Sequence, residues 1–306
     1  MQIMMGIGAV ERDTGLSKDA LRVWERRYGF PMPVRDDLGE RAYPIDQVDK
    51  LRLLKRLLDQ GHRPGKIIHF SVPELQQLVQ PPAQSADVVS GADKNDLQVY
   101  LDLCKAHQAE ALRHGLSQAL SRMGLERFIV ELLAPLNRLV GDAWSNCALQ
   151  VFEEHLYTES VQIVMRAAIS SVQHPQGNVL LRPRILLTTL HQEQHGLGLL
   201  MAEAIFALEG ASCISLGVQT PIMDIVNAAR SQGADIVALS FSGAMNPRHV
   251  LEGLVDLGSK LPPGTELWAG GHCPVLERRP PAAVKVLSKL SEIQDSLIDW
   301  RARHEV

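Results

Sequence analysis

A glutamate and a histidine lie two residues apart where an apolar run passes into a helical pattern, in LTTLHQEQHGLGLLMAE at residues 187–203. The carboxylate of Glu193 could accept a hydrogen bond from one ring nitrogen of His195 and so fix its tautomer. The other ring nitrogen would then be a more basic metal ligand. Gly198 would let a bulky group lie close to the backbone. A histidine on a loop is more often an ordinary polar residue, so the metal-ligand interpretation depends on these neighbours.

The Glu-x-His-x-x-Gly pattern resembles the signature of cobalamin-binding domains, in which the histidine replaces the cofactor's own nucleotide base as the lower cobalt ligand. That family also carries a Ser-x-Leu and then a Gly-Gly further along the chain. This sequence supplies Ser240 in LSFSGA, with a serine in place of the leucine, and Gly270 and Gly271 in WAGGHCP. The resemblance implies that His195 binds cobalt while the serine and the glycines accommodate the nucleotide tail.

A second pattern lies in a separate, helical region, where nine residues separate Trp144 from the pair Glu154-His155. A tryptophan at a helix end is more often part of a hydrophobic core. The spacing nevertheless resembles that of the cobalamin-binding, light-sensing regulators of the CarH and LitR type. In that family these three side chains line the upper face of the corrin and shield the 5′-deoxyadenosyl group of adenosylcobalamin. Ser145 follows the tryptophan where light-sensing relatives place a second histidine, which leaves His155 as the nearby candidate to capture cobalt.

The hydrophobic pattern predicts the elements that position these residues. The strand-like runs are RILLTTL (184–190), CISLGV (213–218), DIVALSFS (235–242), ELWAGG (266–271) and VKVLS (284–288). Because helical stretches separate them, we predict a doubly wound, Rossmann-like parallel sheet over residues 178–306 that is buried on both faces. Ligands of such sheets bind beyond the carboxyl ends of the strands, and His195 follows the first strand at that end.

The residues before the sheet are helical and form a separate segment. In residues 93–177 apolar side chains recur at three- and four-residue spacing, and four helices with short connections predict a four-helix bundle. Residues 76–92 contain a proline pair and small polar side chains typical of a linker. The expected fold is therefore multidomain, with both all-α and α/β parts.

Residues 1–75 predict a winged helix-turn-helix domain. A short helix precedes a Thr-Gly turn, and Ser17 is a suitable N-cap for a second helix that continues to Arg27. The sequence RDDLGERAY has the turn residues of a β-hairpin, and a third helix begins at Ile45. Helix, turn, helix and hairpin wing in this order are typical of a DNA-binding domain.

The second helix carries a basic face, because Lys18, Arg22 and Arg26 recur at four-residue spacing. Such a charge run is more often simply a solvated surface. However, LSKDALRVWERRYGFPMPVR followed by GERAYP resembles the DNA-binding domain of MerR-type regulators over roughly residues 4–70. The resemblance implies a dimer on a two-fold operator. The DNA contacts that it implies are Lys18, Arg22, Arg26, Tyr28 and Arg41. A linker stands where such dimers usually continue into a coiled coil, so self-association is expected from the C-terminal part.

Composition narrows the class of protein further. A chain of 306 residues with 45% hydrophobic and 22% charged residues is expected to form more than one globular domain. The four cysteines form no close pair, which favours a reducing compartment over a disulfide framework. Without a signal segment or a membrane-length apolar run, we expect a soluble, cytoplasmic protein that does not associate with membranes. The net charge is −4, and the mildly basic part of the chain is the front domain.

Together the resemblances cover nearly the whole chain and imply a cobalamin-dependent, light-responsive transcriptional repressor. Its DNA binding would be controlled by the upper cobalt ligand through assembly as a dimer or tetramer. No nucleophile–base pair is evident, so an enzyme is not expected. Three alternatives remain: a corrinoid carrier protein of a methyltransferase system, a cobalamin- or redox-sensing regulator without photochemistry, and a regulator that binds a flavin or haem. A methyl carrier has no need of a winged helix, which favours a regulator.

Overall fold

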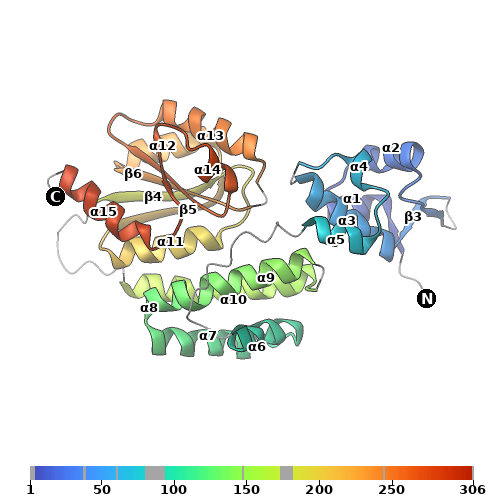
Figure 1. Cartoon of the computed structure of the whole chain (residues 1–306), viewed down its shortest axis with the longest axis horizontal. Helices are drawn as coiled ribbons and strands as arrows, with labels where there is room; N and C mark the ends of the chain where they lie inside the picture. The colour runs from blue at the N-terminus through green and yellow to red at the C-terminus, as the bar shows by residue number, and fades with distance from the viewer. Residues whose placement is uncertain are drawn as a thin grey trace. The chain divides into compact units, whose positions relative to one another are not determined.

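The computed structural model of the chain describes residues 4–36, 39–59, 61–79, 94–146, 148–172, 182–243 and 245–304 (Figure 1). The chain divides into two compact units. The first unit holds Met1–Ala86 with Ser145–Ala148, and the second holds Asp87–Trp144 with Leu149–Val306. None of the helices within the described ranges is long and apolar enough to cross a membrane.

The first unit combines short helices with a small antiparallel sheet, whose strands lie in the order β1-β3-β2. Its helices are α1 (Ile7–Thr14), α2 (Lys18–Tyr28), α3 (Ile45–Asp59), α4 (Pro64–Ile67) and α5 (Val72–Val79), and its strands are β1 (Met4–Gly6), β2 (Val34–Arg35) and β3 (Arg41–Pro44). Helix α2 begins at Lys18 because the side chain of Ser17 accepts a hydrogen bond from the Ala20 N–H. It ends at Gly29, whose φ of +69° favours glycine.

The core of this unit orients helix α2. Leu51 and Leu54 of α3 are completely buried, and they belong to the same cluster as Trp24 of α2 and Tyr43 of β3. Each such leucine stabilises the fold by about 1.5–3 kcal/mol. With Trp24 facing this core, the basic side chains of α2 lie on the exposed surface. Helix α5 continues past residue 75, where the sequence placed the end of the DNA-binding part, and the remainder of the predicted linker, 80–92, lies outside the described residues.

The helical part of the second unit consists of four rods, as the apolar periodicity predicted. The rods are α6 (Lys94–Lys105), α7 (Ala109–Met123), the continuous run of α8 (Leu125–Arg127), the π-helix η1 (Phe128–Leu133) and α9 (Ala134–Ser145), and α10 (Val151–Val172). A π-helical segment inside an α-helical rod is uncommon. Here it begins at Phe128, a side chain that is 1% exposed and packs in the core of the unit.

The α/β part of the second unit is a five-stranded parallel sheet in the order β5-β4-β6-β7-β8. Its strands are β4 (Arg184–Leu190), β5 (Ser212–Thr220), β6 (Ile236–Phe241), β7 (Glu266–Gly271) and β8 (Val284–Leu287). Its helices are α11 (Leu197–Leu208), α12 (Ile222–Gln232), α13 (Pro247–Lys260), α14 (Pro274–Arg278) and α15 (Glu292–Arg303). The predicted strands are thus all present, and β5 begins one residue earlier and ends two residues later than the sequence indicated.

Both faces of the sheet are buried, as predicted. Ile185 and Leu187 of β4 belong to the core shared with α11, α15 and the helical rods, whereas Leu186 and Leu190 belong to the core under α12 and α13. Successive side chains of a strand point to opposite faces, so a strand between two helical layers must be apolar throughout. This arrangement makes the fold Rossmann-like and doubly wound.

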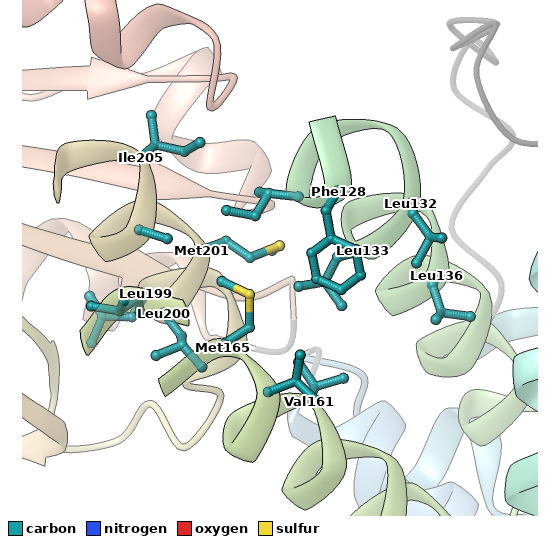
Figure 2. Close-up of a cluster of buried hydrophobic side chains, with 14 of the residues drawn as sticks. Phe128, Leu132, Leu133, Leu136, Val161, Met165, Leu199, Leu200, Met201 and Ile205 are labelled. Carbon is teal, nitrogen blue, oxygen red and sulfur yellow. The ribbon is translucent and has the colours of Figure 1, made fainter. Parts of the chain in front are cut away.

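Helix α11 joins the sheet to the helical rods (Figure 1). Figure 2 shows Met165 and Val161 of α10 facing Leu200 and Met201 of α11, with Phe128 beside them. All of these side chains are buried. The bundle therefore rests on the sheet through a continuous apolar layer that includes helix α11.

Candidate functional site

The loop after β4 lies at the point where the strand order reverses. Strand β5 follows β4 in sequence and pairs with one side of it, while β6 pairs with the other side. Helices α11 and α13, which follow β4 and β6, then cover opposite faces of the sheet. Such a reversal leaves a crevice at the strand ends, and ligands of doubly wound sheets bind there. The loop His191–Gly196 from β4 and Ser242 from the end of β6 meet at this crevice.

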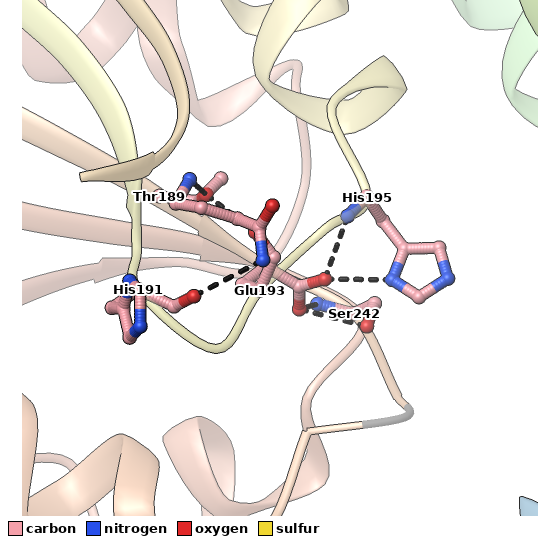
Figure 3. Close-up of polar contacts among 6 residues, drawn as sticks. Thr189, His191, Glu193, His195 and Ser242 are labelled. Atoms are coloured by element: carbon pink, nitrogen blue, oxygen red, sulfur yellow. Dashed lines mark hydrogen bonds and ion pairs between the residues drawn. The ribbon is translucent and has the colours of Figure 1, made fainter. Parts of the chain in front are cut away.

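Glu193 is a buried carboxylate, 1% exposed, that accepts several hydrogen bonds at this crevice (Figure 3). The backbone N–H and the hydroxyl of Ser242 donate to its Oε2 at 2.7 and 2.8 Å. The backbone N–H of His195 donates to Oε1 at 2.9 Å. Although burial raises the pKa of the Glu193 carboxyl, these bonds together with the histidine ring hold it below its usual value. Glu193 is therefore a fixed, ionised acceptor.

The ring of His195 is the main partner of this carboxylate, since Nδ1 lies 2.6 Å from Oε1 of Glu193. An ionised carboxylate only accepts hydrogen bonds, so Nδ1 carries the proton and Nε2 of the neutral ring keeps a lone pair. The hydrogen bond to Glu193 raises the pKa of His195 against the opposing effect of burial, and the charges of Glu193 and Glu154 raise it further. The side chain is 59% exposed. The expected Glu193–His195 hydrogen bond is thus present, and it leaves a basic nitrogen accessible.

The glycine and serine residues singled out in the sequence come together beside this loop. A Cβ on Gly198, in the first turn of α11, would lie 2.8 Å from Oγ of Ser240. Ser240 in turn pairs with Gly270 across β6 and β7. A Cβ on Gly270 would lie 3.1 Å from the backbone oxygen of Leu287 on β8. Three patterns that are far apart in sequence therefore converge at one edge of the sheet.

Position 271, at the end of β7, requires glycine for two reasons. Its φ is +108°, in a region that side chains disfavour. A Cβ there would also lie 2.1 Å from the backbone oxygen of Phe241 on the neighbouring strand. The close approach of the two strand ends depends on the missing side chain.

The residues predicted to cover the upper face lie on the two rods that precede the sheet. Trp144, in the last turn of α9, packs against the core shared by bundle and sheet. Glu154, near the start of α10, accepts a hydrogen bond from the Thr158 hydroxyl at 2.6 Å and is close enough to affect the pKa of His195. The side chain of His155 is 69% exposed, with its Nε2 3.8 Å from Oε2 of Glu154. The charge of Glu154 thus contributes to raising the pKa of His195, and the side chain of His155 is exposed.

Among the residues that the structure describes, His195 has no neighbours that would complete a multi-ligand metal site. Within the described ranges, no group of three or more His, Cys, Asp or Glu side chains could hold a metal ion. Protein sites for a free metal ion use several such ligands. One accessible imidazole instead fits a metal whose remaining positions are filled by a macrocycle, as in haem proteins.

On helix α2 the predicted DNA contacts differ in their partners. Nζ of Lys18 lies 3.7 Å from a carboxylate oxygen of Glu11, and Arg22 pairs with Asp19 at 3.3 Å. Arg26 is exposed and forms no ion pair with the part of the chain that the structure describes. Its guanidinium is the cation of this face that is most readily available to a phosphate.

Tyr28 and Arg41 are more constrained than the other predicted contacts. Tyr28 is half-buried, and a Cβ on Gly65 of α4 would lie 3.3 Å from its hydroxyl. Arg41 of β3 donates from Nε to Glu25 of α2 at 2.8 Å, and this hydrogen bond raises the pKa of the guanidinium. This ion pair links the wing to helix α2. Arg41 therefore has a structural role in addition to its predicted contact with DNA.

Sequence reasoning missed Ser242, whose backbone N–H and hydroxyl donate hydrogen bonds to Glu193. The residue had appeared only as the serine that replaces leucine in the Ser-x-Leu pattern. It also missed Thr189, whose hydroxyl donates to the backbone oxygen of Glu193 at 2.7 Å. The available signal in the sequence was a polar residue within an otherwise apolar strand; in the structure Thr189 is 0% exposed, so its hydroxyl needs a hydrogen-bond partner.

On the expectation that His195 binds the cobalt of a cobalamin, replacing Glu193 with glutamine should weaken cobalamin binding by about 10- to 100-fold, as is typical when a partner of a metal-bound histidine is lost. The amide keeps the size of the side chain but cannot accept at both ends, so one of the donors from His195 or Ser242 loses its acceptor. The pKa of His195 should fall in this variant, because its hydrogen bond to the Glu193 carboxylate is the largest cause of the rise. Cobalamin titration and NMR titration of the ring in the ligand-free protein measure these effects, and an unchanged pKa would contradict the assigned contact.

Comparison with known proteins matches both parts of the chain. Residues 5–70 match the family described as MerR HTH family regulatory protein, and residues 97–169 match the family described as B12 binding domain. The chain is 30% identical over 274 residues to the HTH-type transcriptional repressor CarH of Myxococcus xanthus, covering 86% of this chain and 89% of that protein. It is 27% identical over 252 residues to the repressor CarA of the same organism, covering 82% and 81%.

A solved structure supports the fold of the second unit. The monomethylamine corrinoid protein of Methanosarcina barkeri matches with a TM-score of 0.52 at 14% identity, over 68% of this chain and 100% of that chain. At this identity the likeness concerns the fold alone.

These findings define a transcriptional regulator that joins a winged helix-turn-helix to a B12-binding part, and not an enzyme. The chain belongs to the family of cobalamin-binding MerR-type regulators that includes CarH and CarA. Cobalamin is the cofactor and DNA is the partner that this family membership indicates.

Proposed function

We propose that this protein is a light-responsive repressor that binds adenosylcobalamin through His195. The observation that carries the proposal is the ring of His195, fixed by buried Glu193 at the switch point of the sheet with Nε2 accessible. The residues present fit a corrinoid, because the imidazole of His195 would hold its cobalt through the accessible ring nitrogen. Gly198, Ser240, Gly270 and Gly271 would accommodate the nucleotide tail at the adjoining strand ends.

The upper face would be covered by the bundle. Trp144, Glu154 and His155 lie on the helices α9 and α10, and Glu154 already acts electrostatically on His195. When bound, adenosylcobalamin supplies a weak cobalt–carbon bond that absorbs visible light. The group on the upper face of the cofactor would contact these side chains, and its loss would change how α10 packs on α11. That change would alter the surface through which the protein associates with itself.

Self-association would in turn control DNA binding. We propose a winged DNA-binding domain at residues 1–75, a linker at 76–92, a four-helix bundle at 93–177 and a cobalamin-binding sheet at 178–306. A dimer or tetramer would present paired DNA-binding domains to a two-fold operator, with contacts from Lys18, Arg22, Arg26, Tyr28 and Arg41. Linking two binding modules raises overall affinity by about a hundredfold to ten-thousandfold without any new contact. Loss of assembly would therefore release the operator.

Arg26→Ala should weaken binding to all DNA sequences about equally and reduce the slope of log K against log salt by about one. The reason is that this exposed guanidinium is expected to contact a phosphate. Arg248→Ala is a matched control, since Arg248 is an exposed arginine on α13, which covers the sheet and lies outside the DNA-binding unit. Equal salt slopes for Arg26→Ala and the unchanged protein would contradict the contact.

Illumination of the adenosylcobalamin-loaded protein tests the proposed signal. Oligomer size and operator affinity should both fall after exposure to visible light, and both should stay constant in the dark. Unchanged size and affinity would remove the light response and leave a regulator that senses cobalamin itself. A protein that retains no corrinoid would contradict the proposed cofactor as well.

A further inference from the structure

An unusual backbone conformation lies beside the loop that carries His195. Gln219, near the end of β5, has a φ of +61°, a left-handed conformation that residues with side chains seldom adopt outside glycine, asparagine and aspartate. The residue is exposed, so packing in a core does not impose this conformation. Such outliers persist where surrounding contacts hold them, and they concentrate at ligand sites.

The pairing of β5 with β4 shows how the chain reaches this conformation. Leu187 pairs with Ser215, but Thr188 pairs with Gly217 and Leu190 pairs with Thr220, so β5 twice contains one residue more than β4. Bulges of this kind bend a strand and redirect its side chains, often next to functional sites. Here they turn the end of an edge strand toward the loop that follows β4.

Two hydrogen bonds connect Gln219 to that loop. Its backbone N–H donates to Oγ1 of Thr189 at 2.8 Å, and the hydroxyl of Thr189 donates onward to the backbone oxygen of Glu193 at 2.7 Å. Its side-chain amide donates to the backbone oxygen of His191 at 3.2 Å. Figure 3 shows Thr189, His191, Glu193 and His195 grouped around the turn that these bonds hold.

The far end of the same loop also rests on β5. A Cβ on Gly196 would lie 3.0 Å from Cγ1 of Val218, the residue before Gln219. Both ends of the loop His191–Gly196 therefore contact two consecutive residues of β5, and the carboxylate that orients His195 lies between them. Ser242 fixes that carboxylate from β6, so β5 and β6 hold the loop from opposite sides of β4.

We propose that Gln219 is a positioning residue for the cobalt ligand, a role that rests on the proposed function of His195. A metal-binding side chain must be held to within about half an ångström of its productive position by the contacts around it. Gln219 supplies this support in two ways. Its side-chain amide anchors the start of the loop at His191, and its backbone N–H anchors Glu193 indirectly, through the hydroxyl of Thr189. It touches neither the ring of His195 nor its carboxylate.

Hydrogen exchange in the cobalamin-free protein tests the anchor itself. Gln219→Ala removes the bond to His191, and Thr189→Val removes the relay to Glu193 at nearly constant shape. In each variant, amide exchange across residues 191–196 should accelerate about three- to tenfold, the effect of losing one ordinary hydrogen bond. Thr189→Ser should restore slow exchange. Gln194→Ala, which changes an exposed glutamine of the same loop, is the matched control and should leave the rate unchanged.

The second readout is the fraction of bound cob(II)alamin whose cobalt is coordinated by histidine, measured by electron paramagnetic resonance on protein with ¹⁵N-labelled histidine. The equilibrium constant for histidine coordination, calculated from this fraction, should be about three- to tenfold lower in Gln219→Ala than in the unaltered protein. In Gln194→Ala it should not change. The role of Gln219 is overturned if exchange in Gln219→Ala is unchanged, or if exchange is faster but histidine coordination is unchanged. In either case, histidine coordination in the unaltered protein leaves the proposed function intact. If the unaltered protein shows no histidine coordination, the proposed function fails first and the role of Gln219 fails with it.

Discussion

His195→Ala is expected to lower the affinity for cobalamin by more than about a hundredfold, because it removes the ligand whose supporting contacts alone are worth 10- to 100-fold. Any corrinoid that remains bound should show the absorption spectrum of cobalt without a lower nitrogen ligand. Titration with methylcobalamin, followed by visible absorption, measures both effects.

His191→Ala provides the control for this prediction. His191 belongs to the same loop and is exposed, and the contact described for it uses only its backbone oxygen, which alanine retains. Its affinity and spectrum should therefore match those of the unaltered protein. Equal losses in the two variants would mean that the loop tolerates no change at all, and the specific role of His195 would have no support.

Gly271→Ala is expected to destabilise the second unit by about 3 kcal/mol or more, because the substitution combines a disfavoured φ with overpacking. The added Cβ would lie 2.1 Å from the backbone oxygen of Phe241, a rigid neighbour that cannot move aside as a side chain could. The ends of β6 and β7 would have to separate, which would displace Ser240 from its place beside Gly198. Denaturant unfolding and cobalamin titration should both report the change.

Gly264→Ala separates the two causes. Gly264 has a φ of +85°, but a Cβ there would meet no atom within 4 Å. Its substitution should cost about 1–2 kcal/mol from backbone strain alone and should leave cobalamin binding unchanged. Similar losses of stability in Gly271→Ala and Gly264→Ala would show that the ends of β6 and β7 relax around the new methyl group. That result would contradict the tight packing described for these strand ends.

Most of the fold could be predicted because its signals are local. The runs 184–190 and 266–271 matched β4 and β7 residue for residue, since strands buried on both faces must be apolar throughout. Ser17 and Gly29 likewise fixed the ends of helix α2 through a side-chain cap and a left-handed residue. Helix α15 was not predicted, although Ile293, Leu297 and Trp300 recur at helical spacing and are buried in the core.

The site was predicted only as far as its motifs extended along the chain. The Glu193–His195 bond joins residues two positions apart, so the sequence could suggest it. The contacts of Ser242 and Gln219 join segments far apart in sequence, and they depend on strand order and on the bulges of β5. The approach of Glu154 to His195 depends in the same way on how the bundle packs on α11.

The most direct test of the central claim is the electron paramagnetic resonance spectrum of cob(II)alamin bound to protein whose histidines carry ¹⁵N. Coordination by His195 predicts that each cobalt line, split into a triplet by ¹⁴N in the unlabelled protein, becomes a doublet on labelling. The doublet should be absent from His195→Ala. A triplet that persists after labelling would show that the cofactor's own base remains on cobalt and would contradict the account.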